Sequence, residues 1–194
     1  MSNGVWDWAQ RTTDADAPQT GYGRTYWTND GQFKARNSSG VKRLIGAQAV
    51  LGDVKAQNTA PASLVATTWT TRELQEVTDT DSLVAVTSNQ FVLAVGTWQI
   101  VASGFIAADA ATTLNIRHRV RNITTSTTLI TGKNVRVKDE SSCEWTMVGQ
   151  IVSNGTDAYA IQYYADGTGG ALGYAMNVSG ESERYLDVLL TRIS

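Results

Sequence analysis

The residue types that could carry out catalysis are few in this chain. It has one histidine, His118, and one cysteine, Cys143, so a catalytic triad or a zinc site would have to use a single member of each type. His118 stands between arginines in an alternating run. Their charges disfavour its protonation, and we expect a packed or interfacial histidine. Cys143 begins the strand-like run CEWTM, where a small buried hydrophobic residue is expected rather than a nucleophile.

Acidic and glycine-rich segments give no stronger signal for an enzyme. Asp79-Thr80-Asp81 resembles part of a calcium loop but lacks its glycine and its terminal glutamate. A carboxylate pair for glycoside hydrolysis would form only in space, roughly 5–9.5 Å apart, and no pair stands out in the sequence. Gly167-Thr168-Gly169-Gly170 lacks the lysine and the helix that follow a phosphate-binding loop. We predict no enzyme activity, no cofactor and no required metal, and leave open calcium held by loop oxygens.

Two groups of side chains favour binding or assembly instead. Arg117, Arg119 and Arg121 share one side of the run 112–121, and the opposite side is apolar apart from His118. They are expected to be solvated or to pair with acidic residues of another subunit, with contact to an anionic glycan as the alternative. Trp6 and Trp8 lie in a polar segment too short for a core of its own, which predicts that they anchor this arm to a partner, with packing back onto their own domain as the alternative.

Composition narrows the class of protein. The chain has 194 residues, 42% of them hydrophobic and 18% charged, so composition does not predict disorder. A net charge of -2 argues against a nucleic-acid partner. No apolar run has the length of a membrane span, and no N-terminal signal is recognisable, so we expect folding in a cytoplasm without membrane insertion.

The elements that must position these residues are strands. Residues 24–45 read as strand, turn, strand, turn, strand, with Asp30-Gly31 and Ser39-Gly40 at the turns. Residues 46–61 contain apolar residues at helical spacing, which allows a short helix, and 56–62 read as a linker. The rest predicts an all-β sandwich with strands at 64–70, 83–87, 90–95, 98–107, 112–121, 127–137, 143–153, 157–165, 171–178 and 184–193.

Short sequence motifs in these strands resemble those of two groups of known proteins. The last hundred or so residues resemble trimeric jelly rolls of the C1q and tumour-necrosis-factor type, although Thr156 stands where that family often has glycine. The motifs that carry this resemblance are Leu93-x-x-Gly96-Thr97-Trp98-x-Ile100, Leu114-x-Ile116-x-x-x-Val120-x-Asn122, Asp157-x-Tyr159-x-Ile161-Gln162 and Tyr185-Leu186-x-Val188-x-Leu190. A second motif is similar to a meander found at the start of tailed-bacteriophage structural proteins, and it runs from Gly21-Tyr22-x-Arg24-x-Tyr26 to Asp30-Gly31-x-Phe33-x-x-Arg36-x-x-x-Gly40.

Together these resemblances imply a non-enzymatic bacteriophage virion protein, made in the host cytoplasm and placed on the particle surface as a homotrimer. Residues 1–60 would form a particle-docking arm, β-meander and linker, and residues 61–194 a jelly roll. The short chain favours a capsid decoration (cement) protein or short head fibre. A tail-fibre tip that binds host glycans and, less favoured, a β-sandwich glycan hydrolase are the alternatives. The predicted docking anchors are Trp6, Trp8, Tyr26 and Trp27, and the residues predicted near the three-fold axis are Tyr159, Tyr163 and Tyr185.

Overall fold

The computed structural model describes residues 24–27, 33–36, 42–44, 47–79 and 81–193. The chain divides into two compact units, one of residues 1–47 with 192–194 and one of residues 48–191. In the first unit, β1 (Arg24–Trp27), β2 (Phe33–Arg36) and β3 (Lys42–Leu44) form an antiparallel sheet in the order β1–β2–β3. These are three of the strands that the sequence predicts for residues 24–45, while the predicted turns lie outside the described residues.

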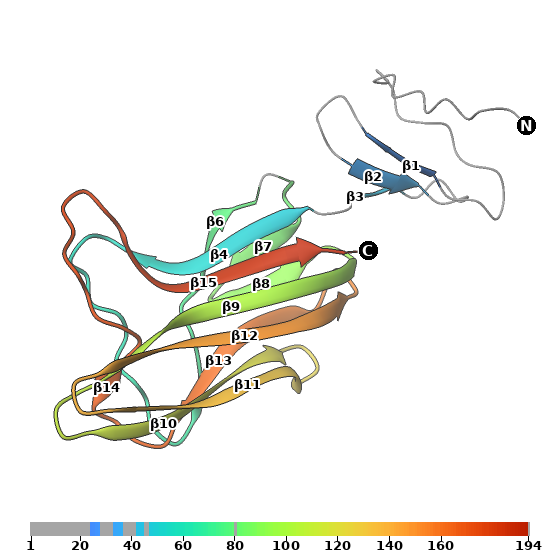
Figure 1. The fold of residues 1–194 in the computed structure, drawn as a ribbon. Coiled ribbons are helices and arrows are strands. Elements are labelled where there is room, and N and C mark those ends of the chain that lie inside the picture. Colours follow the sequence, from blue (N-terminus) through green and yellow to red (C-terminus); the bar gives the residue numbers. More distant parts are fainter. Residues whose placement is uncertain (1–23, 28–32, 37–41, 45–46, 80, 194) are drawn as a thin grey trace, which may run out of the picture. The chain divides into compact units, whose positions relative to one another are not determined.

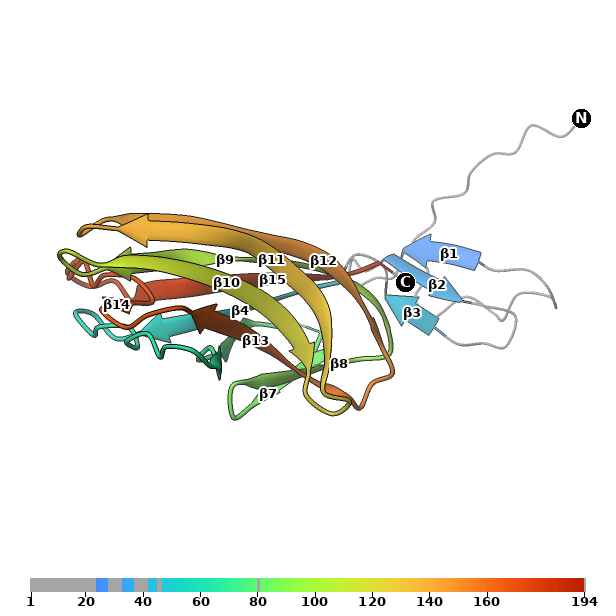
Figure 2. The same cartoon turned by 90° about the horizontal axis from the view of Figure 1, so that it is seen from below.

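The second unit is a sandwich of two six-stranded sheets (Figures 1 and 2). One sheet, here the β10 sheet, has the order β11–β10–β13–β8–β7, and β5 also pairs with β13. The other, here the β12 sheet, has the order β12–β9–β15–β4–β6, and β14 also pairs with β9. The prediction of an all-β jelly-roll sandwich is confirmed.

The bounds of the strands are as follows. The β10 sheet contains β5 (Trp69–Thr71), β7 (Val84–Thr87), β8 (Gln90–Leu93), β10 (Thr113–Asn122), β11 (Thr127–Lys138) and β13 (Ala158–Ala165). The β12 sheet contains β4 (Gln48–Lys55), β6 (Gln75–Thr78), β9 (Gly96–Ala108), β12 (Ser142–Ser153), β14 (Gly170–Ala171) and β15 (Glu183–Arg192).

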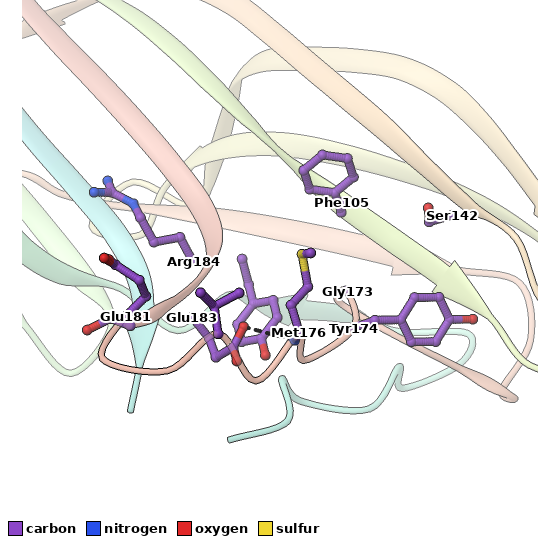
Figure 3. Close-up of a pocket in the computed structure, with 11 residues that line it drawn as sticks. Phe105, Ser142, Gly173, Tyr174, Met176, Glu181, Glu183 and Arg184 are labelled. Carbon is purple, nitrogen blue, oxygen red and sulfur yellow. Dashed lines mark hydrogen bonds between the residues drawn. The ribbon is translucent and has the colours of Figure 1, made fainter. Parts of the chain in front are cut away.

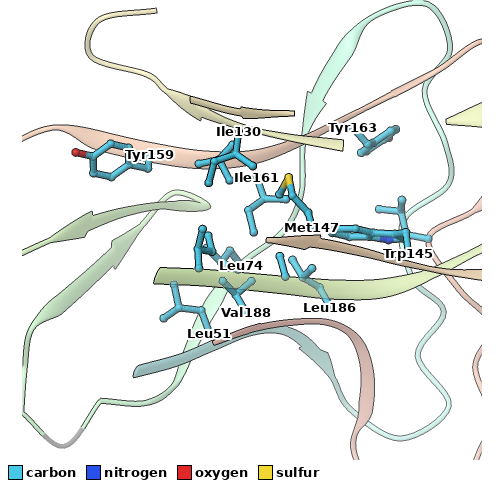
Figure 4. Packing of buried hydrophobic residues seen from close by; sticks show 14 of the residues in the cluster. Leu51, Leu74, Ile130, Trp145, Met147, Tyr159, Ile161, Tyr163, Leu186 and Val188 are labelled. Atoms are coloured by element: carbon cyan, nitrogen blue, oxygen red, sulfur yellow. The ribbon is translucent and has the colours of Figure 1, made fainter. Parts of the chain in front are cut away.

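Alternate residues of the long strands fill one core between the sheets (Figure 4). On β10, Leu114, Ile116, His118 and Val120 are buried, and the intervening arginines face outward, as the alternating pattern predicts. On β12, the buried residues include Trp145, Met147 and Ile151. On β10 and β12 the inward and outward side chains therefore follow from a period of two in the sequence.

The edge strands β11 and β12 of the two sheets contact each other, and a glycine permits this approach. A Cβ atom added to Gly149 of β12 would lie 2.5 Å from Cδ1 and 2.7 Å from Cγ1 of Ile130 on β11. Ile130 therefore packs into space that a larger residue at Gly149 would occupy, and this contact closes one side of the core.

Four sequence-based assignments need correction. Residues 48–55 are strand β4, paired with β15, and not a helix, so the sandwich begins before the predicted boundary at residue 61. In the predicted strand 64–70, only Trp69 and Thr70 belong to β5. In the predicted strand 171–178, only Ala171 is in a strand. Residues 172–182 instead form a loop, because the carboxylate of Glu183 takes up backbone N–H groups there.

Candidate functional site: an exposed apolar sheet face

The structure separates the residues that the sequence singles out for docking and assembly. Trp6 and Trp8 lie outside the described residues. Tyr26 and Trp27 lie on β1, but their side chains are outside the described part of the structure. The prediction that these four residues attach the chain to a particle stays a prediction.

Tyr159, Tyr163 and Tyr185, which the sequence places near a three-fold axis, are core residues of a single chain. Their exposed fractions are 1%, 1% and 3%. The hydroxyl of Tyr163 accepts a hydrogen bond from the Val65 amide at 3.1 Å, and the hydroxyl of Tyr185 donates one to the Thr59 carbonyl at 2.8 Å. Because they have almost no exposed surface left, these tyrosines cannot supply direct contacts to a second subunit, and an assembly surface must use other residues.

The outer side of the β12 sheet offers such a surface. Val148 and Val152 on β12 are 57% and 80% exposed, and Val101 lies opposite Val148 on β9. The outward side chains of β9 from Thr97 to Ser103 and of β12 from Thr146 to Val152 carry no charge. We call this surface the apolar face and define it by Thr97, Gln99, Val101, Ser103, Thr146, Val148, Gln150, Val152 and, on β15, Leu189.

A hollow of about 420 Å³ lies on the same outer side of this sheet, beside the 172–182 loop (Figure 3). Its apolar lining includes Phe105 of β9 and, from the loop, Tyr174, Met176 and Val178. Phe105 is 48% exposed and Met176 77% exposed. Phe105 follows Ser103 in the outward row of β9, with the exposed carboxylate of Glu144 opposite it on β12. The hollow thus adds exposed apolar groups near the apolar face, as is typical of a surface that another protein covers.

The loop keeps its shape because of one carboxylate. Glu183, at the start of β15, accepts hydrogen bonds from the backbone amides of Asn177 at 2.9 Å, Asn58 at 3.1 Å and Met176 at 3.2 Å. The bonds from Met176 and Asn177 are the main reason that the pKa of Glu183 is below its ordinary value of 4.5. The ionised form thus holds the loop against the sandwich, and the loop in turn borders the hollow.

Two of the buried polar residues, His118 and Arg72, pack against Trp145 in the core. His118 and Trp145 stack with ring centroids 3.6 Å apart. The guanidinium of Arg72 lies 5.9 Å from the Trp145 ring, and its Nη2 donates to the Tyr185 carbonyl at 2.9 Å. Burial lowers the pKa of Arg72 to about 10, and the carboxylate of Asp53 opposes this shift. Arg72 follows β5 directly, so its bond to Tyr185 connects the two sheets.

His118 is the packed residue that its sequence context suggests. Burial, followed by the charge of Arg72, lowers the pKa of His118 well below its ordinary value of 6.5. The arginines next to it in sequence are not the cause, because they point to the other side of β10. Within the described residues, neither ring nitrogen of His118 has a hydrogen-bond partner. This geometry gives His118 no nucleophile to activate.

Cys143 and Asp79, the other residues considered for catalysis or metal binding, make contacts that support the fold. Cys143 is half-buried against the core. Oδ2 of Asp79 accepts a hydrogen bond from the Val84 amide at 2.7 Å and so supports a turn. The part of the chain that the structure describes holds no group of three or more His, Cys, Asp or Glu residues placed to bind a metal ion. The same part contains no helix with the length and apolar character needed to cross a membrane.

Comparison with solved structures finds a similar arrangement of strands in tumour-necrosis-factor and C1q domains. Murine APRIL covers 75% of this chain and 99% of its own length at 10% identity, with a TM-score of 0.48. An Eiger TNF from S. frugiperda covers 77% and 94% at 7% identity and a TM-score of 0.48. The globular domain of zebrafish complement 1qA covers 76% and 96% at 12% identity and a TM-score of 0.41. No family model and no curated protein matches the chain.

Acidification tests the role of Glu183. Its pKa is lowered by folding, so its stabilising effect is complete above the unfolded-state pKa and is lost as the pH falls through the folded-state pKa. We expect Glu183→Gln to lower the melting temperature at neutral pH, and the difference from the native chain to shrink once the pH is well below 4.5. Calorimetry across this range measures both. A difference that does not change with pH would contradict the assignment of the loop to the ionised carboxylate.

Proposed function

We propose that the protein is a non-enzymatic structural protein of a bacteriophage virion, displayed on the particle surface as a homotrimer that assembles through the apolar face. The apolar face is the observation that carries this proposal. Val148 and Val152 are exposed among uncharged neighbours on β12, and no described residue of the sandwich covers them. Because these valines are already partly buried, covering each one would contribute at most about 1.5–3 kcal/mol to association.

The placement on a phage particle is supported by the N-terminal sequence. The strands β1–β3 pair in sequence order, as expected for the segment that resembles the start of tailed-phage structural proteins. These strands belong to a compact unit distinct from the sandwich. This division suits a protein in which one unit binds the particle and the other forms the trimer. We place the protein on the capsid as a decoration protein or short head fibre.

A receptor-binding tip on a tail fibre is the second candidate function. The observation that favours it is the cluster of arginine and aromatic side chains on the outside of the β10 sheet, on the opposite side of the sandwich from the apolar face. The two functions are compatible with one trimer and differ in where the trimer sits on the particle.

A charge introduced on the apolar face should prevent assembly. Val148→Glu places a carboxylate in the middle of this face, and its desolvation in an interface is costly. We expect the native chain to have the molar mass of three copies of 20.9 kDa in light scattering, and the variant to have that of one copy. Leu129→Glu is the matched control, because Leu129 is 42% exposed but lies on β11 in the other sheet. A native monomer, or a trimer that survives Val148→Glu unchanged, contradicts the proposed surface.

Removal of residues 1–45 should separate attachment from assembly. Since the sandwich is a compact unit from residue 48 to residue 191, the shortened chain should still fold and form trimers. We expect it to lose binding to phage particles in a co-sedimentation assay in which the full chain is retained. If the shortened chain sediments with particles as the full chain does, the attachment lies in the sandwich and the assignment of the N-terminal segment is wrong.

A further inference from the structure

A second hollow lies on the outside of the β10 sheet, and it is built differently from the one beside the apolar face. Strand register places Trp69 of β5, Tyr164 of β13, Arg117 of β10 and Asn134 of β11 in one row across four adjacent strands. These residues, with Asn115 and Asp166, line a hollow of about 450 Å³. We call it the β10 hollow. Its volume is within the range of small-ligand sites.

Aromatic rings form one side of the β10 hollow. The rings of Trp69 and Tyr164 are half-buried, with centroids 5.7 Å apart and planes inclined by 51°. The guanidinium of Arg119 lies 3.8 Å from the centroid of the Trp69 ring. Nε and Nη2 of Arg119 donate to Oε1 of Gln162 at 2.9 and 2.8 Å, which fixes this guanidinium. The indole is therefore held in place before any ligand binds. Binding then costs little conformational entropy of the Trp69 side chain.

Polar groups with free hydrogen-bonding capacity form the other side. Nε of Arg117 donates to Oδ1 of Asn134 at 2.5 Å. Within the described residues, the two terminal amino groups of Arg117 donate no hydrogen bond and the side chain makes no ion pair. Nearby, Asp166 accepts hydrogen bonds from the backbone and side-chain nitrogens of Asn115 at 2.8 and 2.6 Å. These bonds, the one from the side chain first, lower the pKa of Asp166, so this carboxylate is an ionised acceptor at neutral pH.

The charge around the β10 hollow is positive on balance. Arg117 lines the hollow, Arg119 lies on Trp69, and Arg136 acts on Asp166, the acidic residue of the lining. The guanidinium of Arg119 already contacts Trp69 and Gln162. Among the described residues, the guanidinium of Arg117 bonds only through Nε, so its terminal amino groups can bind a ligand. A guanidinium binds a carboxylate through two parallel hydrogen bonds, which is stronger than a neutral hydrogen bond.

We propose that the β10 hollow is a binding site for an acidic saccharide, with a sugar ring against Trp69 and Tyr164 and its carboxylate on Arg117. A pyranose ring has an apolar C–H face that packs on an aromatic ring, and its hydroxyl groups both donate and accept, which suits the amides of Asn115 and Asn134 and the carboxylate of Asp166. All these groups come from one chain, so this inference goes beyond the proposed assembly and does not depend on it.

Titration calorimetry of the full chain with two acidic probes tests the site. The probes are trigalacturonate and 3′-sialyllactose, which carry the sugar carboxylate on a uronic acid and on a terminal sialic acid, and fully methyl-esterified trigalacturonate is the neutral control. We expect saturable binding of at least one acidic probe, and weaker binding of the neutral one. Arg117→Gln should weaken acidic binding by at least tenfold, equivalent to about 1.4 kcal/mol.

Arg121→Gln is the matched control, because it removes the same charge from the same side of β10 outside the hollow. Arg121→Gln should change the affinity for the acidic probes by less than about twofold, because salt screens an exposed charge that does not contact the ligand. Trp69→Leu, checked for an unchanged melting temperature, should weaken acidic and neutral probes alike. The proposal is overturned if neither acidic probe binds, if Arg121→Gln weakens binding as much as Arg117→Gln, or if single-stranded DNA binds more tightly than both saccharides.

Discussion

The burial of alternate residues between two antiparallel sheets is the constraint on which the rest of the structure depends. Long strands such as β9, β10 and β12 send alternate side chains into one shared core. This core takes up the large aromatic residue Trp98 and, as Figure 4 shows, Trp145, Tyr159 and Tyr163. The buried cation of Arg72 and the ring of His118 are accommodated because they pack against Trp145 and because Arg72 reaches a carbonyl of the opposite sheet. The residues left for function are those that the alternation directs outward.

The two outward surfaces have opposite character, and each suits a different kind of contact. On the β12 sheet the outward positions of β9 from Thr97 to Ser103 and of β12 from Thr146 to Val152 are valine, threonine, serine and glutamine, which favour protein contact without a desolvation penalty for charge. On the β10 sheet the outward positions include arginine, asparagine and tyrosine, which keep hydrogen-bonding groups and aromatic rings in reach of solvent. A trimer that covers the first surface would leave the second exposed, so assembly and ligand binding need not compete.

The sequence predicts the strands that have one buried side and one solvated side, and β10, with its alternating arginines, is the clearest case. The sequence-based prediction is wrong for β4. Its neighbouring residues from Leu51 to Asp53 are all buried, so the period of two disappears and the apolar spacing resembles that of a helix. The sequence-based prediction also fails for the tyrosines, because aromatic content does not say which side of a strand faces the core of its own chain. The β10 hollow has no local signature at all: Trp69, Arg117, Asn134 and Tyr164 meet through the register of four strands.

Distances between identical positions in the assembled protein test the central claim, which is trimer formation through the apolar face. In a Cys143→Ser background, a nitroxide label attached through Gln150→Cys would report on this face by pulsed electron resonance, and one attached through Arg121→Cys would report on the outside of the β10 sheet. The account predicts a three-spin signal for both labels, with much shorter distances between copies at position 150 than at position 121. The absence of any distance between copies, or shorter distances at position 121, would contradict it.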